Sequence, residues 1–189
     1  MITWIPHHLL PTAGRLALSR TPGSSGRPRD VDLDRFSAES VYAVLCLQEA
    51  HELSMLPEAE TIEERRHAVE ARGIRFVHEP VVDMDAPSVE RMQRLVDAVL
   101  ADLDASRNVL VHCWAGLGRA GTLAACTLVA RGLAPQLAVA HLRRLRPGAV
   151  QSVVQERLIR QFGDAVAGRA SIARPEDDSR ASIARPEED

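Results

Sequence analysis

The chain has 189 residues, of which 46% are hydrophobic and 26% are charged, and its formal net charge is −3. This length and apolar content exclude a disordered chain and predict one domain with a buried core. Aromatic residues make up only 3% of the chain, so base-stacking platforms are not expected, and the charge offers no bulk attraction to nucleic acid or to a membrane. We therefore expect a monomer without a nucleic-acid or membrane partner.

The three cysteines, Cys46, Cys113 and Cys126, are far apart in the sequence. An odd number cannot all pair, and their spacing is not that of a metal site. The N-terminus lacks a basic region followed by an apolar core and a cleavage site, and no uninterrupted run of about 18 apolar residues occurs. These features predict a soluble protein in the reducing cytoplasm, without a metal.

Short apolar runs in the N-terminal part predict a sheet. Trp4–Pro6 and Leu16–Leu18 are typical of short strands, and Val41–Leu47 is apolar enough for a central strand that is covered on both faces. Thr21–Arg29, rich in Pro, Gly, Ser and Arg, predicts a mobile surface loop. We interpret the arginines of this loop as solvated, although an acidic or phosphorylated partner remains an alternative.

The middle of the chain predicts two helices and a strand. Thr61–Glu64 has the pattern of a capping box, which starts a helix that ends before Gly73. Ile74–Val77 is typical of a strand. Apolar residues recur at helical spacing over Ser88–Leu103, so this helix packs one face on the sheet.

Gln48–Leu53, between these parts, predicts a loop or a short helix. Its His51 and Glu52 could orient loops at the rim of an active site. A surface role is the simpler interpretation of both side chains.

The most informative stretch is Val109–Thr122, which reads VLVHCWAGLGRAGT. Val109–Val111 predicts a buried strand, Cys113–Arg119 a glycine-bearing turn, and the apolar run Leu123–Ala130 a helix. Backbone amides of such a loop can point at one anion, and the positive end of the following helix strengthens their field. The order of these elements therefore predicts a phosphate site.

Two side chains of this loop add chemistry to anion binding. The amides and the Arg119 guanidinium favour the thiolate form of Cys113 at neutral pH, which makes it a nucleophile. Arg119 can give two parallel hydrogen bonds to a phosphate and can follow its charge as phosphorus passes to sulfur. Glycines at 116 and 118 allow the loop to curl closely. The residues expected to bind phosphate are Trp114, Ala115, Gly116, Leu117, Gly118 and Arg119.

The loop also contains GxGxxG, formed by Gly116, Gly118 and Gly121, which is the fingerprint of dinucleotide binding. That fingerprint needs an acidic residue about 20 positions further on. No Asp or Glu occurs from Thr122 to Gln155, so we exclude this interpretation. A merely buried core cysteine would not need Arg119 and two glycines beside it.

HCWAGLGRAGT resembles the His-Cys-x5-Arg signature of the cysteine-dependent protein tyrosine and dual-specificity phosphatases. The wider chain is similar to their kinase-associated, cyclin-dependent kinase inhibitor type branch, through ITWIP, RLALSRTPG, PVVD and RPGAVQ, over roughly residues 3–163. The resemblance implies an α/β fold, with a central mostly parallel sheet flanked by helices on both faces. It also implies hydrolysis of phosphotyrosine or phosphoserine/phosphothreonine on proteins through a phosphocysteine, without a cofactor.

Expelling the leaving oxygen requires an acid. Asp83 follows a predicted strand, and PVVD matches the family's Pro-x-x-Asp placement of the general acid before the cysteine. Asp85 is the alternative, although its place ahead of Pro87 and Ser88 also suits a helix cap.

Two further roles follow from the resemblance. Gln151, in the stretch Arg146–Gln151, matches the glutamine that positions the hydrolytic water, and a surface amide is the alternative. His112 matches a buried residue whose ring bonds the backbone near Cys113, with a pure core role as the alternative.

The sequence departs from the family pattern directly after the signature arginine. Many members have Ser or Thr there to stabilise the departing thiolate, and this chain has Ala120. Thr122 would point elsewhere on a helix, although a local shift would let it substitute. This departure keeps open a phospho-residue binding module without turnover. A rhodanese-like transferase or an arsenate reductase fits the upstream acid and the position of the cysteine less well.

The C-terminal part predicts a helix near Gln136–Leu145 and then a change of pattern. From Arg169, RASIARPEDDS is followed by the near-duplicate RASIARPEED. We expect a catalytic domain over residues 1–168 and a disordered charged tail over residues 169–189.

Overall fold

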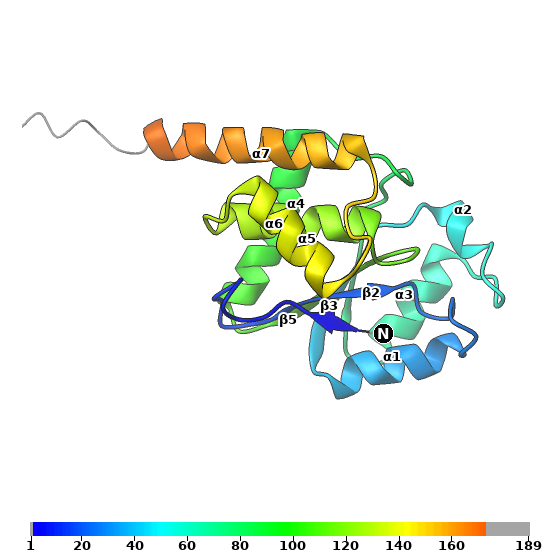
Figure 1. The fold of residues 1–189 in the computed structure, drawn as a ribbon. Helices are drawn as coiled ribbons and strands as arrows, with labels where there is room; N and C mark the ends of the chain where they lie inside the picture. Colours follow the sequence, from blue (N-terminus) through cyan, green and yellow to red (C-terminus); the bar gives the residue numbers. More distant parts are fainter. Residues whose placement is uncertain (1, 173–189) are drawn as a thin grey trace, which may run out of the picture.

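A computed structural model describes residues 2–172 as a sheet of five strands with helices on both faces (Figure 1). The strands are β1 (Thr3–Trp4), β2 (Leu16–Arg20), β3 (Val41–Cys46), β4 (Arg75–His78) and β5 (Asn108–Cys113). The helices are α1 (Arg29–Ala38), α2 (Ala50–Leu53), α3 (Ile62–Glu70), α4 (Val89–Asp104), α5 (Gly118–Ala130), α6 (Pro135–Leu145) and α7 (Val153–Ile172). None of these helices within residues 2–172 is long and apolar enough to cross a membrane.

The strand order is β1-β2-β5-β3-β4, and only the β1–β2 pair is antiparallel. This arrangement confirms the expected α/β fold with a mostly parallel sheet. The register pairs Arg20 with Cys113 and Cys46 with His112, so the central strand β5 and its two neighbours end at the same edge. In parallel sheets ligands bind at the carboxyl ends of the strands, which here surround Cys113.

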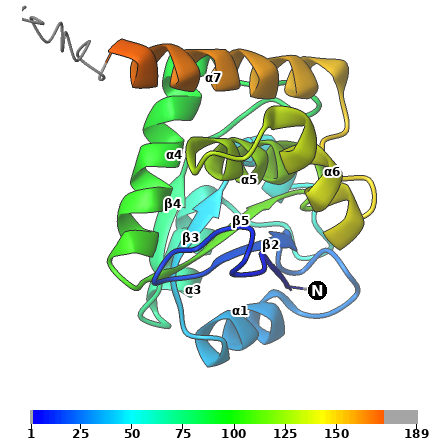
Figure 2. The ribbon, with the colours of Figure 1, turned by 60° about the vertical axis from the view of Figure 1, so that its left-hand side comes forward.

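Helices α4, α5, α6 and α7 cover one face of the sheet, and α1 and α3 cover the other (Figures 1 and 2). Side chains of β5 alternate between the two cores, with Val109 and Val111 on the first and Leu110 on the second. A strand buried on both faces needs apolar residues at every position, which explains the apolar runs of β3 and β5.

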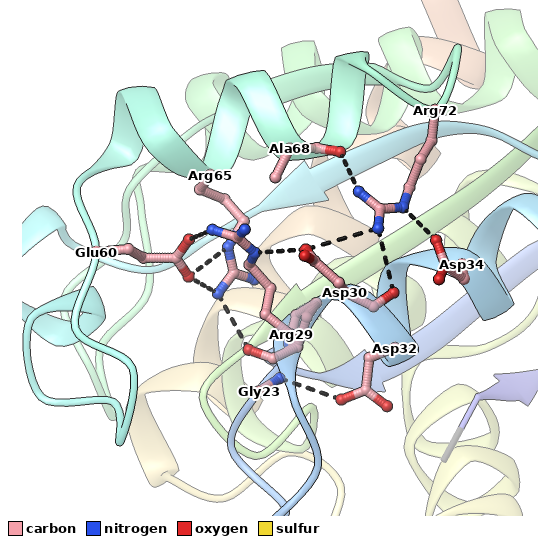
Figure 3. Close-up of polar contacts among 10 residues, drawn as sticks. Gly23, Arg29, Asp30, Asp32, Asp34, Glu60, Arg65, Ala68 and Arg72 are labelled. Atoms are coloured by element: carbon pink, nitrogen blue, oxygen red, sulfur yellow. Dashed lines mark hydrogen bonds and ion pairs between the residues drawn. The ribbon is translucent and has the colours of Figure 1, made fainter.

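Two of these helices were not predicted from the sequence, namely α1 and α7. Only Asp32, Leu33 and Phe36 of α1 are buried, so it lacks a clear apolar stripe. Ion pairs hold α1 instead, including one of 2.7 Å from Arg72 Nε to Asp34 Oδ1 (Figure 3). Helix α7 continues to Ile172, and the rest of the expected tail lies outside the described residues.

The loop over residues 21–28 has no regular structure, as expected, but contacts within the chain hold it. Arg29 Nη1 lies 2.8 Å from Glu60 Oε2, and Arg27 Nη2 lies 3.3 Å from Asp32 Oδ1. The Gly23 amide donates to Asp32 Oδ2 at 3.1 Å (Figure 3). Arg27, interpreted as solvated, therefore fastens the loop to α1, and Arg29, the first residue of α1, pairs with Glu60 just before α3.

Candidate active site

Cys113 is the last residue of β5, and α5 starts five residues later at Gly118. The cysteine is 3% exposed. Leu117, the N-cap residue of α5, provides no side-chain cap for the helix. The uncapped first turn and the short loop before it thus form an anion-binding end of the kind expected from the sequence.

The carbonyl groups of the loop are bound from outside it. Hydrogen bonds run from the Thr21 amide to Trp114 O (3.0 Å), from Arg146 Nη2 to Ala115 O (2.8 Å) and from the Val150 amide to Leu117 O (3.2 Å). In each peptide unit the carbonyl and the amide N–H point in opposite directions. Carbonyl groups that point out of the loop therefore turn the amide N–H groups toward its centre. Segments from three parts of the chain therefore set the curl of the loop.

Glycine is required at Gly116. It has a φ of +69°, and a Cβ there would stand 2.1 Å from Ser19 O, in agreement with the sequence argument. A Cβ on Gly118 would stand 2.8 Å from Gln151 Oε1 and 2.9 Å from Gln155 Nε2, so a larger residue there would displace the ends of these two side chains.

The side chain of Arg119 is wholly buried beneath the loop. It forms a two-pronged ion pair with Glu52, with distances of 2.6 Å from Nη1 to Oε2 and 2.7 Å from Nη2 to Oε1. Nη1 also donates to Val81 O at 3.0 Å. Burial lowers the pKa of Arg119, but the bonds to Glu52 and the charge of Cys113 outweigh it and raise the pKa above its ordinary value.

Glu52 is a site residue for which the sequence favoured a surface role over the alternative of orienting loops at the rim of an active site. The surface role expected for it is wrong, since it is 6% exposed and faces Arg119, whereas His51 is exposed as expected. Its carboxylate also accepts from the Glu49 amide at 2.8 Å and closes the capping box of α2. Burial raises the pKa of Glu52, but Arg119 and the Glu49 amide lower it more, and it ends below its ordinary value.

Asp83 lies on the loop between β4 and α4, with its side chain 61% exposed and its Oδ1 3.0 Å from Arg119 Nη2. Asp85 is also exposed, and its Oδ1 accepts from the Ala86 amide at 2.8 Å. Ser88, rather than Asp85, caps α4. The structure thus brings Asp83 to the arginine of the loop.

His112 is wholly buried behind the loop, on the opposite side of β5 from Cys113. Burial and the charge of Arg65 lower the pKa of His112, the Cys113 backbone opposes them, and the pKa ends at about 3. Neither ring nitrogen makes a hydrogen bond of normal geometry within the described residues. The ring is therefore neutral at physiological pH.

Two glutamines, one just before α7 and one in its first turn, lie beside the loop. The Gln151 side chain borders Gly118, and the backbone amide of Gln151 donates to Gln155 Oε1 at 2.8 Å. Gln155, which the sequence analysis did not consider, is wholly buried and donates to Asp85 O at 3.3 Å. The sequence signal that could have identified Gln155 is its position four residues after Gln151, about one helical turn further on.

Arg146 is a further residue without an assigned role from the sequence. Besides holding Ala115, it donates from Nη1 to Thr3 Oγ1 at 3.0 Å, which connects β1 to the loop. Burial lowers the pKa of Arg146, and the charge of Cys113 opposes this shift. Thr122 turns away from the site, because its hydroxyl donates to Gly118 O at 2.8 Å.

Comparisons with known proteins agree with this geometry. The family model described as "Swiss Army Knife protein, DSP-PTPase phosphatase domain" matches residues 19–159. Cyclin-dependent kinase inhibitor 3 from Sus scrofa is 34% identical over 102 residues, which cover 52% of this chain and 48% of that protein. The human protein of the same name is 32% identical over the same length. The chain thus spans about half the length of the curated relatives it matches.

Two solved structures extend the comparison to most of the chain. The active form of Tk-PTP is 32% identical, with a TM-score of 0.67, and the match covers 80% of this chain and 92% of that one. Kinase associated phosphatase with its catalytic cysteine replaced by serine has a TM-score of 0.78 at 24% identity, covering 88% and 96% of the two chains, and shows the shared fold. Fold and loop define the tyrosine and dual-specificity class of phosphatase domains. Within that class, the chain belongs to the Swiss Army Knife DSP-PTPase family.

Proposed function

We propose that this chain hydrolyses phosphomonoesters of proteins, on tyrosine or on serine and threonine, through a phosphocysteine at Cys113. The observation that carries the proposal is that the exposed Asp83, from a separate loop, lies against the buried Arg119 at the uncapped start of α5, directly after the loop that Cys113 begins. Nε of Arg119 has no acceptor within the described residues and can donate to a phosphate oxygen. The geometry supports Asp83 over Asp85 as the acid.

In the first step the Cys113 thiolate attacks phosphorus, the phosphorus–oxygen bond of the ester breaks, and Asp83 protonates the leaving oxygen. The loop amides and Arg119 stabilise charge on the transferred group. In the second step Asp83 takes a proton from a water molecule placed by Gln151. That water attacks phosphorus, and phosphate and the Cys113 thiolate are released.

The names of the relatives support a protein substrate, since one is a cyclin-dependent kinase inhibitor and another a kinase associated phosphatase. The loop itself presents Trp114, Ala115 and Leu117, none of them basic, which suits a single phosphate. We extend the proposal to a monomer that acts in the cytoplasm.

The test is hydrolysis of p-nitrophenyl phosphate in EDTA by wild type, Cys113→Ser and Cys126→Ala. The proposal predicts turnover by the wild type, turnover by Cys126→Ala, whose cysteine is buried in α5, and none by Cys113→Ser. Turnover that persists in Cys113→Ser would refute the phosphocysteine.

A second candidate is a phospho-residue binding module with little turnover. It is favoured by Ala120, which provides no hydroxyl, and by the Thr122 hydroxyl, which is bound to Gly118 O. This candidate predicts that the wild type retains phosphopeptides and releases no phosphate. Rapid-mixing kinetics of wild type and Ala120→Ser separate the two candidates. If the missing hydroxyl is what prevents turnover, Ala120→Ser should restore the release of phosphate from the phosphoenzyme.

A further inference from the structure

Three exposed apolar side chains border the candidate active site. Met55 is 67% exposed, Val82 55% and Met84 46%. Met55 follows α2, which provides Glu52, and the other two flank Asp83. Single exposed hydrophobic residues are common on protein surfaces, but neighbours that surround one site indicate a contact surface.

The backbone around Asp83 holds two of these side chains in solvent. The Asp85 amide donates to Val82 O at 3.1 Å, which closes a turn with Asp83 and Met84 at its centre. Met84 has a φ of +59°, in the left-handed region that non-glycine residues seldom adopt. Such strain persists where the surroundings impose it and is concentrated at functional sites.

A cavity of about 380 Å³ lies between these segments. It is lined by Glu49, His51, Glu52, Met55, Asp83 and Trp114. Asp83 belongs to the loop between β4 and α4, which we name the acid loop. Trp114 belongs to the loop Cys113–Arg119, which we name the phosphate loop. The cavity is therefore within reach of a residue next to the phosphorylated one when the phosphate group occupies the phosphate loop.

We propose that Met55, Val82, Met84 and Trp114, which we name the apolar rim, bind an apolar side chain beside the phosphorylated residue of a protein substrate. This inference rests on the proposed function and specifies its substrate. The charged neighbours of the rim disfavour an anionic membrane, because Glu49, Asp83 and Asp85 would repel its headgroups. Met55 and Trp114 give an apolar side chain its contacts in the cavity, and two of the acidic walls, Glu52 and Asp83, are already paired with Arg119. A neutral peptide segment with an apolar residue therefore suits this surface better than an anionic membrane.

The test uses two phosphopeptides that are identical except for Leu or Ser next to the phosphorylated residue. For the wild type we expect kcat/KM to be about tenfold higher for the Leu peptide. The double variant Met55→Ser, Met84→Ser should lose that preference through KM. The matched control is Leu137→Ser on α6, whose side chain is 52% exposed and which should keep the preference. Hydrolysis of p-nitrophenyl phosphate should be the same in all these proteins.

The same peptides are then bound to Cys113→Ser, with and without the two Met changes, by fluorescence polarisation. Preferential binding of the Leu peptide that disappears with the Met changes supports the rim even if hydrolysis fails, so a failure of the proposed function remains distinguishable. Equal binding of the two peptides overturns the inference. Binding to vesicles of phosphatidylcholine and phosphatidylserine that depends on Met55 and Met84 also overturns it, in favour of a membrane surface.

Discussion

Two buried arginines of this molecule look alike by burial and by pairing, but their surroundings differ. Arg119 lies in the first turn of α5 and is held by Glu52. Arg65 lies in α3 and is held by Glu60, with 2.8 Å from Nε to Oε1. Both side chains are wholly buried. The other contacts of Arg65 are structural, since it donates to Pro22 O at 3.0 Å and shares Glu60 with Arg29 (Figure 3).

Arg119, by contrast, connects its buried carboxylate to the reactive groups of the candidate site. It touches the exposed Asp83 and attracts the charge of Cys113. The comparison shows that a buried ion pair does not by itself mark a functional site. What identifies the functional site here is a buried cation that also faces a nucleophile and an exposed acid.

The substitution of each arginine by lysine should show the largest contrast. Lysine keeps the charge but loses the planar fork, so we expect Arg119→Lys to lower kcat/KM for p-nitrophenyl phosphate by about 10³-fold. Arg65→Lys should leave kcat/KM within about threefold and lower the free energy of unfolding by about 2 kcal/mol. Steady-state kinetics measure kcat/KM, and urea denaturation measures the free energy of unfolding. Equal losses of kcat/KM in the two variants would contradict the distinction between the two arginines.

The two aspartates of the acid loop come next. Asp83→Asn should lower kcat by about 10²-fold with an alkyl phosphate, because that leaving group needs a proton. A substrate with a good leaving group should be affected less. Asp85→Asn is the matched control, and its kcat should stay near the wild-type value. If Asp85→Asn instead lowers kcat more than Asp83→Asn does, the acid is Asp85.

The carboxylates that hold the arginines should separate activity from stability. Glu52→Gln releases Arg119, and we expect at least about a tenfold loss of kcat/KM from its misplacement. Glu60→Gln should destabilise the fold by about 3 kcal/mol, since it leaves Arg65 buried without a counter-charge, and should spare kcat at low temperature. The kinetics are measured at a temperature at which circular dichroism shows both variants to be folded. A loss of kcat/KM in Glu60→Gln as large as that in Glu52→Gln would contradict the prediction.

The smallest expected effect is the pH dependence of stability due to His112. The native pKa of about 3 lies below the ordinary value of 6.5, so the unfolded chain binds a proton that the native one excludes. Stability therefore falls on acidification from 6.5 toward 3, by about 1.5 kcal/mol down to about pH 5. His112→Gln should flatten this part of the profile in urea titrations, whereas His8→Gln, at the surface, should not.

The sequence was sufficient to predict elements with a strong local pattern. The strand–loop–helix around Cys113 and the capping box at Thr61, whose Oγ1 accepts from the Glu64 amide at 3.2 Å, are confirmed. Helix α1 lacked such a pattern, because ion pairs rather than an apolar stripe hold it.

Contacts between distant segments were beyond the reach of local patterns. Glu52 and Arg119 are 67 positions apart, and only the parallel sheet brings them together. The capping box of Glu49 and Glu52 signalled a helix, but it did not show that the same carboxylate binds Arg119. Arg146 is likewise joined to Thr3 across nearly the whole chain.

The most direct test of the central claim is to trap the covalent intermediate. Wild-type protein is mixed with p-nitrophenyl phosphate, quenched in acid within the first turnover, digested and examined by mass spectrometry. We predict one phosphoryl group on the peptide that contains Cys113, formed in a burst with p-nitrophenol. A chase should remove it from the wild type and leave it on Asp83→Asn, which lacks the base of the second step. Turnover without label on Cys113, or label on another residue, would contradict the account.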